Sequence, residues 1–140
     1  MSRLRQHWAL LGLLIVGGCA ATMPPPDITG AGTQLETRQI QTRQYDTLDK
    51  AMTMRSVVAT LQDLGFTIDQ ADAELGTITA TRLHKYTMRM TVTVVKKEGD
   101  QISVRTNARI GENAVTDAAT YQDFFVVLDK AMFLTEHKVD

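Results

Sequence analysis

The stretch that decides the fold is YTMRMTVTVVKKEGDQISVRTNARI, residues 86–110. Apolar and polar residues alternate through it, and a period of two predicts strands with one buried and one solvated face. The apolar positions are Tyr86, Met88, Met90, Val92 and Val94 in the first half, and Ile102, Val104 and Ala108 in the second. The sequence Glu98-Gly99-Asp100 between the halves predicts a turn. Residues 86–96 and 101–110 are therefore predicted to form a β-hairpin.

Three further segments that precede this hairpin are predicted to be strands. They cover residues 38–46, 66–72 and 77–83, and a turn at 74–76 joins the last two. Residues 83–86, Leu-His-Lys-Tyr, contain no residue typical of a turn. A bulge and a single long bent strand are therefore both open at that point.

Two amphipathic helices are predicted, over residues 49–64 and 117–134. The first has Asp46 or Thr47 as its N-cap and ends at Gly65, which favours a left-handed C-cap. The apolar stripes are Ala51, Met54, Val57, Val58 and Leu61 on the first helix, and Tyr121, Phe124, Phe125, Leu128 and Met132 on the second. The order of elements predicts an α+β fold, in which two helices pack on one face of an antiparallel sheet of four to five strands.

Length and composition limit the chain to one small globular domain, predicted over residues 38–140. The chain has 140 residues, of which 44% are hydrophobic and 22% are charged. Arg3 and Arg5 are the only charged residues of segment 1–18, so removing that segment would change the formal charge from -1 to -3. A mildly acidic body is a poor partner for nucleic acid, because non-specific binding depends on neutralising many phosphates. Nucleic-acid binding is therefore not expected.

The N-terminal segment has the organisation of an export signal. A basic start is followed by the apolar run WALLGLLIV, residues 8–16, which has about half of the ~20 residues that a membrane-spanning helix needs. A run of this length after a basic start predicts a cleaved signal peptide over residues 1–18. Cys19 follows directly and is the only cysteine in the chain, so a disulfide within the chain is excluded.

The sequence VGGC, residues 16–19, resembles the lipobox of bacterial lipoproteins. The resemblance implies cleavage before Cys19, a diacylglyceryl thioether on its sulfur and an acyl chain on its new N-terminus. Two or more acyl chains hold a protein stably on a membrane, whereas one gives only marginal binding. Because Ala20 rather than Asp follows the cysteine, the resemblance further implies the periplasmic face of the outer membrane.

A tether is predicted between the lipidated cysteine and the domain, over residues 19–37. The prolines at 24–26 favour an extended polyproline form, and Gly30 and Gly32 are expected to prevent regular secondary structure. The tether would hold the folded domain away from the bilayer.

No constellation for catalysis or metal binding is recognised in the sequence. His84 and His137 lack ligand spacing, and Ser56 and Ser103 do not lie in a nucleophile elbow. A catalytic cysteine would need a base nearby, which Cys19 lacks in the sequence. The sequence therefore predicts no enzyme, no catalytic or metal-ligating residue, and no cofactor beyond the lipid on Cys19.

Three segments of the domain carry a wider resemblance. LQDLGFTI, GTITATRL and YQDFFVVLDKAMFL resemble parts of small, mostly uncharacterised outer-membrane lipoproteins of proteobacteria. That resemblance covers most of residues 38–137 and includes no catalytic motif. The order of elements is similar to that of the BamC-type helix-grip domains of the outer-membrane barrel assembly machinery. This second similarity concerns fold order only and bears on function by analogy.

The solvated face of the predicted sheet is the first candidate partner-binding surface. Arg89, Arg105 and Arg109, together with Arg43, are expected there among Thr79, Thr91, Thr93 and Asn107. Threonine and arginine suit any solvated strand face, so ordinary solvation is one interpretation. The other is a docking face for an acidic partner or for a polymer such as peptidoglycan or lipopolysaccharide.

The second candidate surface lies on the predicted C-terminal helix. Val126 and Phe133 lie seven residues apart, beside Gln122 and Asp129, and point away from the core stripe. An exposed aromatic residue tends to mark an interface. The alternative is that the C-terminal tail or the proline-rich tether covers it.

These features together favour a lipid-anchored periplasmic protein that acts through protein–protein contacts in an envelope assembly, secretion or export complex. An alternative of a different class is a carrier that holds an acyl chain between the sheet and the helices. The carrier is suggested by the flexible side chains of Met54, Met88, Met90 and Met132, which also suit an ordinary core.

Overall fold

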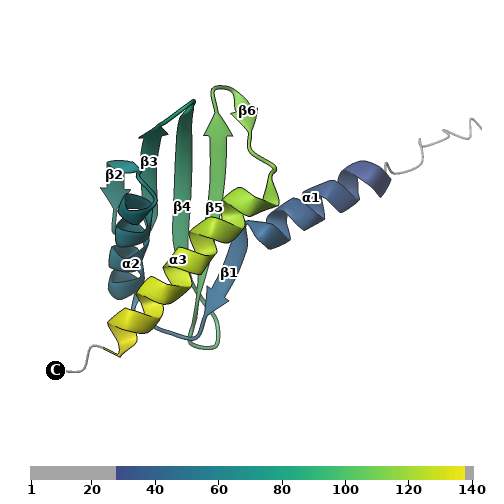
Figure 1. Ribbon diagram of the computed structural model, residues 1–140. Coiled ribbons are helices and arrows are strands. Elements are labelled where there is room, and N and C mark those ends of the chain that lie inside the picture. The colour runs from purple at the N-terminus through teal and green to yellow at the C-terminus, as the bar shows by residue number, and fades with distance from the viewer. Residues whose placement is uncertain (1–27, 138–140) are drawn as a thin grey trace, which may run out of the picture.

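The computed structural model describes residues 28–137, which form an α+β fold with an antiparallel sheet. The elements in chain order are α1 (Ile28–Ile40), β1 (Thr42–Tyr45), α2 (Lys50–Asp63), β2 (Thr67–Asp72), β3 (Thr77–Leu83), β4 (Thr87–Lys97), β5 (Gln101–Ile110), β6 (Asn113–Ala114) and α3 (Ala118–Glu136). Helices α2 and α3 lie side by side in front of the sheet, and α1 projects away from it (Figure 1).

The sheet has six strands in the order β1-β5-β4-β3-β2, and the two-residue strand β6 also pairs with β5. This is one strand more than the four to five expected, and α1 is a third helix where two were expected. The predicted hairpin is confirmed as β4 and β5, with Lys97 opposite Gln101 across the turn. One neighbour of the hairpin, β3, directly precedes β4 in the chain, whereas the other, β1, comes from a segment more than fifty residues before β5.

The core lies between the sheet and the two covering helices. Alternate residues of the central strands fill it, among them Ile78, Val92 and Val104, none of which is exposed. The five residues predicted as the apolar stripe of the C-terminal helix are all buried on α3. A continuous cluster of this kind is what period-two strands and an amphipathic helix produce when their apolar faces meet.

Helix α2 begins and ends as its local sequence dictates. Its N-cap is Asp49 rather than Asp46 or Thr47, and the Asp49 carboxylate accepts a hydrogen bond from the backbone N–H of Met52 at 2.8 Å. At the other end Gly65 is left-handed, with φ of 82°. The N–H of Phe66 donates to the carbonyl of Leu61, which completes a Schellman motif and confirms the predicted cap.

The buried face of α2 is rotated from the predicted stripe. Ala51 is exposed and Val58 is half-buried, whereas Thr53, Ser56 and Thr60 are buried. The prediction assumed one apolar contact surface, but α2 packs against both the sheet and α3. Small threonine and serine side chains on that helix allow the close approach of α3.

Three segments differ from the sequence prediction. Residues 28–37 of the predicted tether are helical despite Gly30 and Gly32, because α1 runs without interruption to Ile40. The strand expected over 38–46 is therefore only the four residues of β1. Residues 84–86 form neither a bulge nor a bent strand but a turn, in which the N–H of His84 donates to the carbonyl of Tyr86.

The Tyr121 hydroxyl closes a gap at the edge of β5. Strand β1 pairs with β5 up to Arg105, and β6 pairs with it from Arg109 onward. Between these points the N–H of Ala108 donates to the Tyr121 hydroxyl at 3.2 Å, and that hydroxyl donates to the carbonyl of Val115 at 2.5 Å. The Gln41 amide also donates to it, at 3.1 Å. One buried side chain of α3 thereby satisfies backbone groups that no strand reaches.

Candidate docking surfaces

The outer face of the sheet, which is the face opposite α2 and α3, carries the three predicted arginines. Strand register places Arg89 directly opposite Arg109 across β4 and β5, and Arg105 between Thr93 and Thr42. All three side chains are exposed. Helices α2 and α3 lie on the other side of the sheet, and Arg105 shares a pocket with Gln34, Thr37 and Arg38 of α1 (Figure 1).

Threonines and amides fill the outer face between the arginines. The register aligns Thr79, Thr91 and Asn107 in one row across three strands, and Thr77, Thr93 and Arg105 in the next. Arg105 and Arg109 lie about 13 Å apart along β5, since each residue of a strand advances about 3.3 Å. The outer face is therefore a polar surface on which the strand register fixes the spacing of three arginine Cα atoms.

The positive charge of the outer face is only weakly compensated. Arg109 pairs with Glu112 at 3.6 Å, and both side chains are more than half exposed, so this pair contributes little. Among residues 28–137, Arg89 and Arg105 lie within 4.0 Å of no carboxylate. Like charges directly opposite each other on neighbouring strands are destabilising. The Arg89–Arg109 arrangement is thus a small cost to stability that binding an anionic group would relieve.

Arg43 was predicted on the outer face, and the structure shows this to be wrong. Its partner in the register is Val104, so its side chain lies on the same face of the sheet as α3. There the Arg43 guanidinium forms an ion pair with Asp129 and lies over the ring of Phe125, 4.8 Å from its centroid. The Tyr45 hydroxyl donates to Asp129 at 2.7 Å. Arg43 therefore fastens the edge strand β1 to α3.

The contact with Asp129 and Arg43 changes the pKa of the Tyr45 hydroxyl. Burial raises the pKa of its hydroxyl above the ordinary value, and the hydrogen bond to Asp129 and the charge of Asp129 raise the pKa further. The positive charge of Arg43 acts in the opposite direction. The Tyr45 hydroxyl therefore stays protonated as a donor to Asp129.

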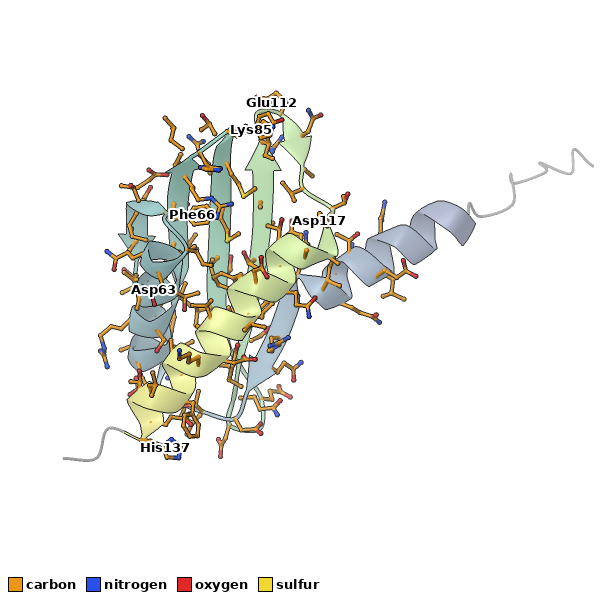
Figure 2. All side chains as sticks on the ribbon, in the orientation of Figure 1. Asp63, Phe66, Lys85, Glu112, Asp117 and His137 are labelled. Carbon is orange, nitrogen blue, oxygen red and sulfur yellow. The ribbon has the colours of Figure 1, made fainter. Side chains whose placement is uncertain are left out.

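The second candidate surface, on α3, is exposed as predicted. Val126 is 58% exposed and Phe133 is 59% exposed, and Leu134, which the sequence reasoning missed, is 51% exposed. Among residues 28–137, His137 is the one aromatic residue whose ring stacks on Phe133, with 4.1 Å between the ring centroids. Figure 2 places His137 at the end of α3 opposite Asp117. The exposed positions lie on different sides of the helix, since Leu134 lines the groove between α2 and α3.

The methionines that suggested a carrier belong to the core. Met54, Met90 and Met132 are buried in the apolar cluster, and Met88 packs against it. A groove of about 760 Å³ lies between α2 and α3, outside this core. Its walls include Ala59, Val127 and Ala131, with Arg55 and Lys130 among the charged residues.

The lipidation site, metal ligands and membrane-spanning helices were also predicted or excluded from the sequence. Cys19 lies outside the described residues, and its lipidation stays a prediction. Within residues 28–137 no three His, Cys, Asp or Glu side chains are grouped as metal ligands. None of the helices in that same part of the chain is long and apolar enough to span a membrane.

Comparison with known proteins gives no assignment. No protein-family model matches the chain, and no curated protein matches its sequence significantly.

Sequence reasoning missed a groove along the edge of the sheet, between α2 and β2. Its walls include Ala51 and Ala59 on α2 and Ala71 and Ala73 at β2 and the turn that follows it. The signal available in the sequence was the recurrence of alanine on two segments that pack together. The alanines predict a groove only once the strand order is known, because that order places β2 at the edge of the sheet.

Proposed function

We propose that this chain is a non-enzymatic, lipid-anchored protein of the periplasmic face of the outer membrane, and that it serves as a subunit or accessory of an envelope assembly, secretion or export complex. The observation that carries the proposal is the outer face of the sheet, where Arg89, Arg105 and Arg109 are exposed on the side opposite α2 and α3. The proposed partner is a protein or envelope polymer with acidic groups.

Strand register and charge support a docking role for the outer face. Arginine makes paired hydrogen bonds to carboxylate and phosphate groups, so three arginines at spacings set by the strands favour an anionic partner. Hydrogen bonds from the intervening threonines and Asn107 would add specificity. An interface of this kind would gain both association rate and selectivity from electrostatic complementarity.

The proposed anchor supports the same role. The lipobox-like VGGC places the lipid on Cys19, and α1 begins at Ile28, a short distance along the chain. Helix α1 projects away from the sheet, and its first turn lies away from α2 (Figure 1). A Cys19→Ser variant should lose incorporation of labelled palmitate and leave the membrane fraction. Unchanged labelling would refute the anchor.

The docking role is tested by cross-linking in intact cells with the acylated full-length protein. A photoreactive residue in place of Asn107, at the centre of the outer face, should capture one or a few defined envelope components. The same residue in place of Asp123, which is exposed on α3, is the matched control and should not capture them. Equal capture from both positions would contradict a docking role for the outer face.

The carrier is the second candidate function, and the groove between α2 and α3 favours it. A cleft with apolar wall residues, in which the cations Arg55 and Lys130 outnumber the carboxylate Asp63, suits an amphiphile with an anionic head. Packing of the methionines in the core is the ordinary explanation of those residues. Mass spectrometry of gently purified protein decides between the two, because a co-purifying lipid other than the covalent anchor would support the carrier.

A further inference from the structure

Strand β2 leaves one side of the sheet open. It pairs with β3 on one side, and no strand of residues 28–137 pairs with it on the other. An edge strand presents unpaired N–H and C=O groups that can pair with an added strand. The register is irregular between Ile68 and Gln70, and it is regular from Gln70 to Asp72. The regular part of the open edge is therefore short and lies toward the β2–β3 turn.

A groove runs beside this part of the edge, on the helix side of the sheet. One section, of about 420 Å³, lies between α2 and β2, and the next, of about 580 Å³, lies near the start of α2. The two sections share Ala51, Met54 and Ala73, so they adjoin. Ala71 pairs with Ile78, which places its side chain on the groove side of β2. Alanine on both walls leaves room for side chains of an added strand.

The end of the groove near the β2–β3 turn carries two lysines and one carboxylate. Lys50, Lys96 and the exposed Leu48 line it together with Asp49, whose carboxylate is engaged as the N-cap of α2. The Lys50 ammonium donates to the carbonyl of Glu74 at 2.9 Å, which holds it at this end. A partner with an acidic residue at this point would be complementary in charge to the two lysines.

We propose that an extended peptide segment of a partner protein adds to β2 as an antiparallel strand. Its backbone would pair with the N–H and C=O of Ala71, because those of Gln70 and Asp72 face β3, and its alternate apolar side chains would enter the groove beside Ala71 and Met54. Since β2 runs toward Lys50 and Lys96, an antiparallel segment has its N-terminal end there. The segment therefore carries an acidic residue near its N-terminal end.

A second copy of this chain fits the edge less well than a peptide. Two β2 strands paired edge to edge would bring Asp69 and Asp72 of each copy near the other. Like charges oppose that pairing, and a bulge interrupts the long flat edge that it needs. The groove is independent of the outer face of the sheet, because it lies on the opposite side.

The test is a selection from a library of random peptides displayed on phage, against the full-length chain. Enriched peptides should alternate apolar and polar residues and carry an acid near the N-terminal end. A synthetic copy of an enriched peptide should slow hydrogen exchange at Ala71, whose N–H faces the open edge. The affinity should fall about ten-fold or more in Ala71→Trp, which fills the groove, a loss of ~1.4 kcal/mol.

The matched control is Gln70→Trp, on the opposite side of the same strand, which should bind the peptide as the natural chain does. Lys96→Glu, at an exposed position, should weaken binding of the acidic peptide and leave folding intact. Failure to enrich any peptide, equal binding to the Ala71→Trp and natural chains, or protection only away from β2 would each overturn the proposal. So would a self-associated dimer that Ala71→Trp dissociates. None of these outcomes depends on capture from the outer face.

Discussion

The two faces of the sheet are built from the same strands and differ in almost every physical respect. On the inner face Ile78, Val92 and Val104 are fully buried under α2 and α3. On the outer face their neighbours in the chain, Thr79 among them, are partly exposed beside arginines. Because successive side chains of a strand point to opposite faces, the residues that stabilise the core and the residues available to a partner lie on opposite sides of the sheet. Substitutions on the inner face should change folding, and those on the outer face should change binding.

The largest effect is expected from truncating an inner-face residue. Ile78→Ala should lower the free energy of unfolding by about 2–5 kcal/mol, because it removes buried methyl groups and leaves a cavity. Its neighbour Thr79→Ala should change it by about 1 kcal/mol or less, the range of strand propensities. Urea unfolding of both variants measures the difference. Equal destabilisation by the two would mean that the outer face is also packed.

Removing the Tyr121 hydroxyl should cause the next largest loss of unfolding free energy. Tyr121→Phe should cost about 1–3 kcal/mol, because the buried N–H of Ala108 and the amide of Gln41 lose their acceptor. Hydrogen exchange at Ala108 should accelerate more than exchange at Val92. A variant as stable as the natural chain would show that water or a rearranged β6 replaces the hydroxyl.

The sequence predicted the parts of the fold that depend on local pattern. Strand periods, the cap at Gly65 and the α3 stripe follow from neighbours in the chain, and the structure confirms them. The position of Arg43 could not be predicted, because it depends on which strand β1 pairs with and in what register. The rotated face of α2 likewise reflects a contact with α3, more than fifty residues later in the sequence.

For the candidate sites too, local sequence pattern predicted some features, whereas strand pairing and strand order determined the others. Arg89 and Arg109 were assigned to one face by alternation, but their direct opposition is a matter of pairing. Helix α1 was missed because glycine disfavours a helix and Gly30 and Gly32 stand within it. The groove along β2 needed the strand order as well as the sequence.

The third prediction concerns Tyr45, at the boundary between sheet edge and α3. Below about pH 10 the hydroxyl is protonated in both folded and unfolded chains, and its contribution to stability is fully present. Above about pH 10 the unfolded chain loses the proton and the folded chain keeps it, so stability falls as pH rises. Urea unfolding from about pH 8 to pH 11 should show a steeper loss than in Tyr45→Phe, by at most about 1.4 kcal/mol per pH unit. Parallel curves would contradict the raised pKa.

The smallest effect on stability is expected at the paired arginines. Arg89→Glu should leave the free energy of unfolding unchanged or raise it by about 0.2–1 kcal/mol, because a carboxylate then faces Arg109. The gain should fade in high salt, since the charges are exposed. Thermal unfolding at low and high salt measures it. A loss of several kcal/mol would show that Arg89 has a structural role.

The central claim is that the outer face binds a partner and contributes little to folding. The most direct measurement is quantitative cross-linking in cells from a photoreactive residue at position 107, in the Arg89→Glu, Arg105→Glu double variant. The control is Lys130→Glu, which reverses a charge on the helix side of the sheet. We expect the first variant to fold normally and lose the captured partner, while the control retains it. Undiminished capture by the first variant, with folding intact, would contradict the claim.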